Sequence, residues 1–418
     1  MKKFIFTISL VLASLMPSVL RAQTEQLLTV SGIVRDDTRR LPFVSVTIKD
    51  SPLGTITNED GYFTLKIPST DKEITIVVSH VGYYTNEINV KAGEANAMRI
   101  FLKPYPNMLD PALIVVMDPE SLIREALYRV RDNYPSSPIL QRGFYRETAR
   151  KGTRFISVSE AVIDMYKYGY AKSTLFDRVA ILKGRRLMSQ KSADTLAVKL
   201  LGGPVLALDR DVVKNPDDLF FTDDLHSYEY TMDDPTVIDE RPVYVVRMTP
   251  KYRNDKYALY NAKVFIDKER LAIMRVESSV DMYDPYLVSN SILVKKPSGM
   301  KFEAKDVSFI TSYRFVEGKA VINYIRGSME FKCDWKKRLF SSSYTVVTEM
   351  VATDTQSDDP PVIPLKNAFR GGEAFYDKVD DFADPDFWGD YNILEPSESL
   401  EHAVDRLRRK VSKPQNQK

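Results

Sequence analysis

The sequence predicts a mainly β protein, in which an N-terminal seven-stranded β-sandwich precedes a larger antiparallel, curled, half-barrel-like β-sheet domain with flanking helices. Two observations carry this prediction. Between Val30 and Pro104, short segments alternate apolar and polar residues with period two between turn residues, which is typical of strands with one buried face. From Gly143 onward more such segments follow, without the strand–helix alternation that would indicate a parallel sheet.

The pattern also predicts how the chain is divided. We expect a signal peptide at 1–22, the sandwich at 28–103, a stiff linker at 104–117 and the sheet domain at 118–411. Both globular parts are long enough to bury a core, since 44% of the residues are hydrophobic.

The first residues have the three parts of a secretory signal. Lys2 and Lys3 precede an apolar run from Phe4 to Leu15, and the small residue Ala22 marks the expected cleavage site. No cysteine follows the run, so no lipid-modified N-terminus is expected. No later run reaches the length of a membrane span, so we expect a mature chain without a transmembrane segment, in the periplasm or on the periplasmic face of the outer membrane.

Within the sandwich, Asn58-Glu59-Asp60-Gly61 predicts a tight hairpin, because Gly61 can take the positive φ that such a turn requires. Two more short strands are expected before Leu102. The other segments that we expect to be strands are Val30–Arg35, Phe43–Lys49, Tyr62–Ile67 and Ile74–Ser79.

Four motif blocks in this region resemble the carboxypeptidase-regulatory-like (transthyretin-like) domain, which is common in envelope proteins of Bacteroidetes-type bacteria. The blocks are Val30-x-Gly32-x-Val34-x-Asp36, Leu41-Pro42-x-Val44-x-Val46, Thr57-Asn58-x-Asp60-Gly61-x-Phe63 and Ser79-His80-Val81-Gly82-Tyr83. They cover under a fifth of the chain. The resemblance implies a structural or interaction module and no carboxypeptidase activity. TonB-dependent transporters carry a similar sandwich, but this chain is too short for their barrel.

Two amphipathic helices are expected to flank the second domain. The first begins at Pro119 with Asp118 as its cap, and Tyr134-Pro135 ends it. The second runs from Glu398 to Val411 with Ser397 as its cap, and its apolar face is expected to pack on the sheet.

Between these helices we expect one large meandering antiparallel sheet, with hairpin links at Asp267–Arg270 and Glu317–Lys319 and a turn at Phe144–Glu147. The expected strands are Phe155–Ile163, Ser227–Thr231, Val243–Met248, Ala262–Ile266, Ala272–Val280, Ser291–Val294, Lys301–Tyr313, Ala320–Phe331 and Tyr344–Val351.

Two looser resemblances concern this sheet domain. The Phe144–Glu147 turn and the segment Val264–Asp267 resemble a region that large Bacteroidetes envelope proteins carry behind the sandwich. The pattern Tyr260-x-x-x-Val264-x-Ile266-Asp267 with Leu271-x-Ile273 resembles periplasmic lipoprotein carriers, whose half-open barrel holds an acyl chain. That second resemblance implies an apolar ligand.

Charge and cysteine content exclude several classes. The 59 basic residues nearly cancel the 57 acidic ones, so no strong field favours nucleic acid. Cys333 is the only cysteine, so no intrachain disulfide can form, and its phase with Met329, Phe331 and Trp335 predicts a buried strand thiol.

The three histidines offer no convincing metal centre, and we expect no metal, cofactor or catalytic residue. His80 continues the buried phase of its strand, which predicts a structural role, and His402 falls on the solvent face of its helix. His226 and Glu229 match a His-x-x-Glu zinc spacing with His402 as a third ligand. However, a strand would place positions i and i+3 on opposite faces.

The remaining polar groups are expected to have structural or surface roles rather than catalytic ones. We expect the paired carboxylates to lie in surface loops, with binding of calcium or a basic partner as the alternative for Asp380-Asp381. Lys183–Arg186 is expected to be a solvated turn. Tyr166, Tyr168 and Tyr170 are expected to pack across strands on one face, with stacking on sugars as the alternative. Asn58-x-Asp60-Gly61 lacks the acidic pattern of a calcium loop. The carboxylate pairs are Asp223-Asp224, Asp233-Asp234 and Asp380-Asp381.

The sequence therefore predicts a non-catalytic exported cell-envelope protein with a binding or scaffold role, whose sheet domain holds an apolar, lipid-like ligand or contacts an envelope protein. The alternative is an envelope hydrolase, acting on peptides or glycans, whose carboxylates form no visible motif.

Overall fold

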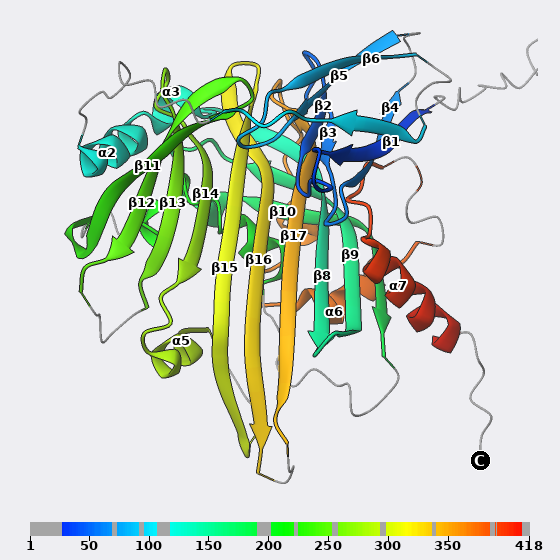
Figure 1. Ribbon diagram of the computed structural model, residues 1–418. Helices are drawn as coiled ribbons and strands as arrows, with labels where there is room; N and C mark the ends of the chain where they lie inside the picture. Colours follow the sequence, from blue (N-terminus) through cyan, green and yellow to red (C-terminus); the bar gives the residue numbers. More distant parts are fainter. Residues whose placement is uncertain are drawn as a thin grey trace, which may run out of the picture.

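The computed structural model describes residues 27–68, 73–91, 96–106, 118–189, 202–220, 225–252, 258–292, 298–336, 340–384, 389 and 391–411. The predicted signal peptide at 1–22 lies outside these ranges. The fold is mainly β, as predicted, with a small sandwich set against one large open sheet (Figure 1).

The sandwich has the seven predicted strands, arranged as a three-stranded sheet β4-β1-β7 and a four-stranded sheet β3-β2-β5-β6. Its core lies between the two sheets and is formed by alternate strand residues such as Val30, Val46, Phe63 and Ile76. The strands are β1 (Leu27–Arg35), β2 (Ser45–Ile48), β3 (Gly54–Ile56), β4 (Tyr62–Pro68), β5 (Glu73–Ser79), β6 (Asn86–Lys91) and β7 (Met98–Phe101).

The predicted Asn58–Gly61 hairpin is confirmed, and the reason for glycine is visible. Gly61 has φ +78°, and a Cβ there would lie 2.8 Å from the carbonyl oxygen of Val34. The prediction for Phe43 was wrong. It precedes β2 in a turn with φ 59°, a conformation that few residues with a bulky side chain adopt.

The second domain is a ten-stranded antiparallel sheet in the order β10-β9-β8-β17-β16-β15-β14-β13-β12-β11. It is not closed, and β10 and β11 form its edges. The strands are β8 (Ile139–Lys151), β9 (Arg154–Lys167), β10 (Arg178–Met188), β11 (Tyr228–Ile238), β12 (Arg241–Pro250), β13 (Tyr260–Asp267), β14 (Ile273–Val280), β15 (Met300–Val316), β16 (Lys319–Trp335) and β17 (Ser342–Gln356).

Three local predictions for this sheet were wrong. Phe144–Glu147 is not a turn but the middle of β8, and Lys183–Arg186 is not a turn but part of β10. Ser291 belongs to a helix rather than to the expected strand Ser291–Val294, of which 293 and 294 lie outside the described ranges. The hairpin links at Asp267–Arg270 and Glu317–Lys319 are confirmed.

Both predicted flanking helices form. Asp118 caps the first, since its carboxylate accepts a 2.9 Å bond from the amide of Ser121. The second packs Leu400, Val404 and Leu407 against Val158 of β9. The α-helices are α2 (Pro119–Tyr128), α3 (Val130–Asn133), α4 (Gly203–Leu208), α5 (Pro285–Ile292), α6 (Phe375–Lys378) and α7 (Glu398–Val411). The 3-10 turns are η2 (Thr174–Phe176), η4 (Pro216–Asp218), η5 (Leu225–Ser227), η6 (Leu365–Asn367) and η7 (Val379–Phe382).

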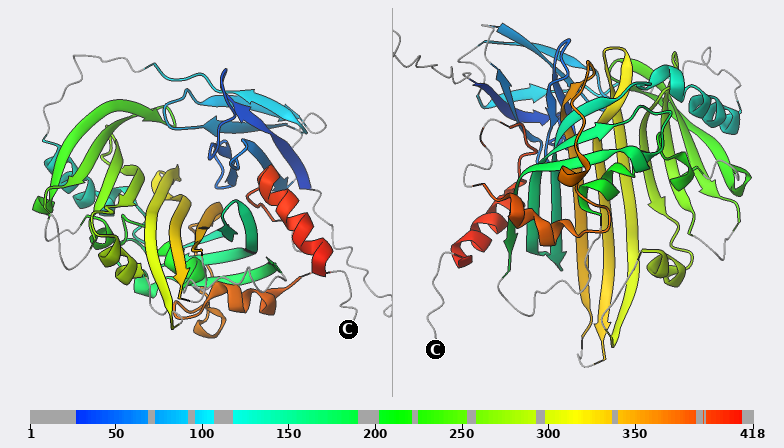
Figure 2. Two further views of the ribbon diagram at one scale, coloured as in Figure 1. Left: turned by 60° about the horizontal axis from the view of Figure 1, so that its bottom comes forward. Right: turned by 180° about the vertical axis from the view of Figure 1, so that it is seen from behind.

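The two faces of the large sheet have different neighbours. One face, called here the helix face, packs against α2, α4 and α6 in a continuous apolar core to which all ten strands contribute. Seen from behind, the orange segment that holds α6 crosses over the strands on this side (Figure 2). The other face, called here the sandwich face, carries the sandwich and α7. Within the described ranges, no helix has the length and apolar character needed to cross a bilayer.

Candidate functional site

The sandwich packs on the sheet at both of its ends. At one end, the ring of Phe43 stacks on Tyr324 of β16 with centroids 5.4 Å apart, and Ile56 joins the same buried cluster. At the other end, the amide of Gly82 donates a 2.9 Å bond to the carbonyl of Val237, and Val81 packs on the cluster around Val243. The sandwich therefore bridges β16 and β11 on the sandwich face.

The segment 391–397 before α7, called here the strap, lies between the sandwich and the large sheet. Asn392 exchanges two hydrogen bonds with the backbone of Lys66 at 2.6 and 2.9 Å, which mimics the pairing of a further strand on β4. Asn58 donates to the carbonyl of Pro396 at 2.8 Å. On the sheet side, Arg146 donates to the carbonyl of Leu394 at 2.7 Å. The strap thus bonds to both domains.

A single row of side chains crosses the sandwich face, with one residue from each of the ten strands. Each residue lies directly opposite the next in the strand register, and the signs of the charges mostly alternate. From β10 to β11 the row, called here the charged row, consists of Arg185, Glu160, Arg146, Glu349, Arg326, Ile310, Glu277, Lys263, Arg247 and Thr231. Opposite charges directly across a strand pair attract, so this register is electrostatically favourable.

The half of the charged row nearest the strap is buried. Glu160 is fully buried and accepts bonds from Arg146 at 2.8 Å and from Arg185 at 2.5 Å. Burial alone would raise the pKa of Glu160, but the two guanidinium groups lower it. Glu349 accepts a 2.9 Å bond from the hydroxyl of Tyr324, the ring on which Phe43 stacks. This half of the row holds β8 and its neighbours beneath the sandwich.

The other half of the charged row is open. Arg247 and Lys263, whose side chains are 45% and 41% exposed, share the carboxylate of Asp233, with shortest distances of 2.7 and 3.1 Å. Burial would raise the pKa of Asp233, but hydrogen bonds from Arg247 and Lys263 lower it. Glu277 pairs with Arg275 of the same strand at 2.7 Å. These side chains remain accessible from solvent.

A second row of short neutral side chains runs beside this open half. On each strand its residue lies two positions from the residue of the charged row, on the same face of the sheet. It consists of Ser328, Ser308, Ser279, Asn261 and Thr249 from β16 to β12, and we call it the hydroxyl row. Because these side chains are short and those of the charged row are long, the surface sinks between them. The result is an open depression of about 510 Å³.

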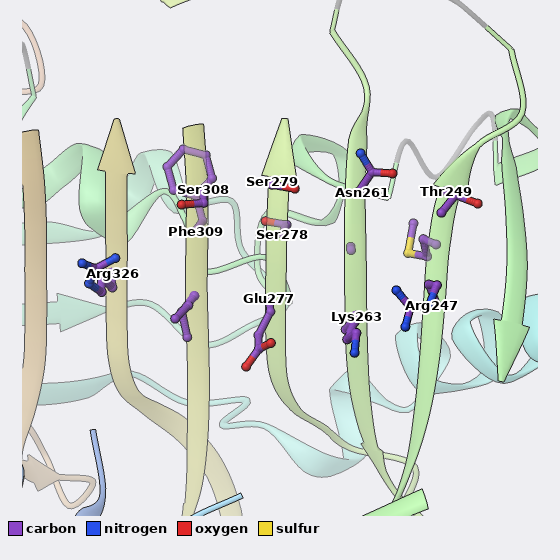
Figure 3. Close-up of a pocket in the computed structure, with 13 residues that line it drawn as sticks. Arg247, Thr249, Asn261, Lys263, Glu277, Ser278, Ser279, Ser308, Phe309 and Arg326 are labelled. Atoms are coloured by element: carbon purple, nitrogen blue, oxygen red, sulfur yellow. The ribbon is translucent and has the colours of Figure 1, made fainter. Parts of the chain in front are cut away.

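Nine of the thirteen residues that line the depression are polar, and the other four are Met248, Ala262, Phe309 and Ile310. Its lining includes Arg326, Glu277, Lys263 and Arg247 in one line and Ser308, Ser279, Asn261 and Thr249 in the next, as Figure 3 shows. Arg326 forms its boundary with the sandwich, since its guanidinium lies 3.5 Å from Glu59 and over the ring of Phe43. Such an arrangement can hold a ligand that carries polar groups.

The helix face, in contrast, is filled. Lys167 is fully buried and lies 2.7 Å from Asp211, which also accepts a 2.7 Å bond from the hydroxyl of Tyr313. Burial would lower the pKa of Lys167, but Asp211 and Asp177 raise it. Lys214 lies 2.5 Å from Asp177. These ion pairs hold the segment after α4 against the strands of the helix face.

One buried acid on the helix face has no cationic partner among the described residues. Glu147 of β8 accepts a 2.7 Å bond from the hydroxyl of Tyr145, and burial raises its pKa to about 7. The residue was part of the segment predicted to be a turn, so its burial could not be anticipated.

The structure separates the residues of the zinc pattern. His226 lies in η5 with an exposed side chain, and its Nδ1 is 3.6 Å from Oε1 of Glu120. Glu229 is exposed on β11, and His402 is exposed on α7. Across the parts of the chain that the structure describes, no three or more His, Cys, Asp and Glu side chains are grouped to hold a metal ion.

His80 and Cys333 have the environments that the sequence predicts. Cys333 is buried in β16, and burial raises its pKa to about 11, so the thiolate is disfavoured. His80 directly follows β5 and is largely buried where the sandwich meets the sheet. Burial and the nearby Arg275 and Arg39 lower its pKa to about 4.

The acidic and basic surface groups differ from their predictions. Asp233 is on a strand rather than in a loop, and Asp380 in η7 pairs with Arg186 of β10. Lys183 pairs with Asp384 at 2.9 Å. Asp223-Asp224 lies outside the described residues.

The three tyrosines do not share one strand face, because β9 ends at Lys167. Tyr166 and Tyr168 pack edge to face, with ring centroids 5.1 Å apart. Tyr170 packs instead on Tyr134 in the helix-face core.

Comparison with known proteins supports the N-terminal resemblance. Residues 30–114 match the family model described as the CarboxypepD_reg-like domain. Over 92 residues the chain is 37% identical to the TonB-dependent receptor SusC of Bacteroides thetaiotaomicron, a match that spans 22% of this chain and 8% of the receptor.

Solved structures were also matched over the larger part of the chain. A LolA superfamily protein from Nitrosomonas europaea aligns at 11% identity and a TM-score of 0.22, covering 59% of this chain and 96% of that one. An outer membrane lipoprotein-sorting protein domain from Vibrio parahaemolyticus aligns at 8% identity and a TM-score of 0.25, covering 58% and 93%. These scores are too low to assign a shared fold. The match at residues 30–114, in contrast, shows that this segment of the chain is a CarboxypepD_reg-like domain.

Proposed function

We propose that the protein is a non-catalytic binding protein of the cell envelope whose ligand occupies the depression on the sandwich face. The observation that carries the proposal is the polar depression itself, formed by the charged and hydroxyl rows and bounded by the docked sandwich through Arg326. Since Arg326 contacts Glu59, the sandwich and the sheet both shape one end of the site.

The proposed location rests on two observations. The N-terminal segment has the parts of a secretory signal, and the sandwich is similar to part of a TonB-dependent receptor of Bacteroides thetaiotaomicron. We propose that the mature chain lies in the periplasm or on the periplasmic face of the outer membrane. An apolar, lipid-like ligand stays a prediction, and the packed helix face makes the open depression the better candidate.

Photo-cross-linking in intact cells tests the proposal. A benzophenone amino acid in place of Ser279 samples the depression, and the same group in place of the half-exposed Lys305 on β15 is the matched control. We expect a covalent adduct of defined mass from position 279 that position 305 does not give. The absence of an adduct from position 279, or the same adduct from both positions, would contradict a specific site there.

A further inference from the structure

We infer that the ligand of the depression is an acidic saccharide chain, lying across β12–β16 with its anionic groups on the charged row and its hydroxyls on the hydroxyl row. This inference rests on the proposed function, because it names the chemical class that the same site would hold. Four observations support it: the charge of the site, the unpartnered Nε of Arg326, the hydroxyl row and the length of the depression.

The charge of the site favours an anion. Arg247 and Lys263 share one carboxylate, that of Asp233, so this end of the depression keeps one positive charge in excess. Charge-assisted bonds to carboxylate or phosphate oxygens are stronger than neutral ones, and guanidinium groups can make two at once. An anionic group is therefore expected over Lys263 and Arg247.

The other end of the depression has unused hydrogen-bonding capacity. Nε of Arg326 is buried and has no hydrogen-bond partner among the described residues, whereas Nη2 of the same side chain lies 3.5 Å from Oε1 of Glu59. A buried N–H without a partner is costly, and a ligand oxygen can supply the acceptor. Glu277 lies between the two cationic ends and is neutralised by Arg275. The anionic groups of the ligand are thus expected to be separated along its chain, with one group near each cationic end of the depression.

The hydroxyl row matches an alcohol-rich chain. Ser308, Ser279, Asn261 and Thr249 each present a short group that can donate and accept hydrogen bonds. Hydroxyl and amide groups both donate and accept, as saccharide hydroxyls do. An apolar ligand would leave these groups desolvated and unpaired, so it is disfavoured here.

The dimensions suit an extended ligand. Neighbouring strands lie about 4.8 Å apart, so the five strands span roughly 19 Å along the rows. The depression is open rather than enclosed, and the docked sandwich bounds it at Arg326. A chain of a few sugar units can lie along it, with one end near the sandwich and the other on β12.

Binding of defined soluble oligosaccharides to residues 23–418 tests the inference. Trigalacturonate and a hyaluronan tetrasaccharide are the acidic probes, maltotriose is the neutral saccharide, and tripolyphosphate is an anion without hydroxyl groups. We expect at least one acidic probe to bind, with an affinity about tenfold or more above that of maltotriose, and to weaken as salt rises. Isothermal titration calorimetry measures each affinity.

Three variants assign the binding to the two rows. Lys263→Gln and Ser279→Val should each weaken the acidic probe about tenfold, since each removes one ligand contact. The control Lys305→Gln removes an exposed positive charge from β15 outside the depression and should leave the affinity unchanged. Circular dichroism and thermal unfolding check that each variant is folded.

Two kinds of result would overturn the inference. Failure of both acidic probes to bind at millimolar concentration, or equal binding of maltotriose, would exclude an acidic saccharide. Binding of tripolyphosphate as tight as that of the acidic probes, with no loss in Ser279→Val, would indicate a simple anion site. If cross-links still form from position 279 in either case, the proposed binding function stands and only the ligand class is wrong.

Discussion

Phe43 of the sandwich stacks on Tyr324 of the sheet with ring planes inclined by 22°, and the hydroxyl of Tyr324 in turn donates to Glu349 of the charged row. One aromatic contact therefore joins the sandwich to the electrostatic network of the large domain. Phe43 reaches this position only through its positive φ, which costs on the order of 1 kcal/mol. The contact must offset that strain.

Replacement of Phe43 tests whether this contact fixes the sandwich. Phe43→Ala should lower the free energy of unfolding by about 2 kcal/mol, because the stacked ring and its buried area are lost while the strained φ remains. Differential scanning calorimetry should show the sandwich unfolding in a separate, earlier transition. Tyr84→Ala, which removes a half-exposed ring elsewhere on the sandwich, should not split the transition.

Two neighbouring arginines of β8 should differ widely in their contribution to stability. Arg146 is 2% exposed and is paired with the fully buried Glu160, so Arg146→Ala should cost about 3–5 kcal/mol by leaving buried charge uncompensated. Arg142 is 43% exposed and pairs with Asp164, so Arg142→Ala should cost about 1 kcal/mol or less. Urea unfolding at neutral pH measures both. Equal losses would mean that burial of the row is not what stabilises it.

Glu147 should make the protein less stable as pH rises. Its pKa is raised to about 7 in the fold from an ordinary 4.5, so the folded state holds the proton more tightly than the unfolded state. The contribution of Glu147 to the free energy of unfolding is therefore complete below about pH 4.5. It is lost as pH rises to about 7, and it does not change further above that pH. Glu147→Gln keeps an acceptor for Tyr145 and removes the ionisation.

The variant should be more stable than the natural protein by up to about 3 kcal/mol at about pH 8 and nearly equal to it at about pH 4. Urea midpoints at several pH values give the difference. A difference that does not vary with pH would show that Glu147 is not the titrating group.

His80 should make the protein less stable as pH falls, which is opposite to the effect of Glu147. Its pKa falls to about 4 from 6.5, so below 6.5 the unfolded state binds the proton that the folded state excludes. Stability is then lost as pH falls from about 6.5 toward about 4. Because Arg275 of the sheet contributes to the shift, protonation should also weaken docking of the sandwich.

Hydrogen exchange of the Gly82 amide, which bonds to Val237 across the two domains, reports docking directly. Its exchange should accelerate on acidification in the natural protein and much less in His80→Gln. Equal acceleration in both proteins would assign the effect to another group.

Periodicity predicted the sandwich well because each of its strands buries one face only. It failed at Phe144–Glu147 because β8 buries both faces. Phe144 and Arg146 point to the sandwich side, and Tyr145 and Glu147 point to the helix side, so no alternation of apolar and polar residues remains. A cluster of mixed residue types inside an otherwise β-rich chain is therefore compatible with a central strand.

The depression could not be predicted for a different reason. Ser279 and Ser308 are unremarkable in sequence and become neighbours only through the pairing of β14 with β15. The charges of the charged row were visible one by one, but their alignment depends on nine strand registers at once. The segment Lys183–Arg186 looked like a solvated turn because its pairing partners, Glu160, Asp380 and Asp384, are distant in the chain.

The charged row also constrains which insertions and deletions the chain can accept. In a strand, a shift by one residue turns every side chain to the opposite face. Loss of a single residue from the tight β15–β16 turn at Glu317-Gly318 would force one of the two strands to slip. If β16 slipped, Arg326 would take the place of Ile325 and face the packed apolar core, and Gly327 would lie opposite Glu349. The charged row therefore disfavours a wrong strand register. Insertions and deletions among related sequences should be confined to the longer loops between strands.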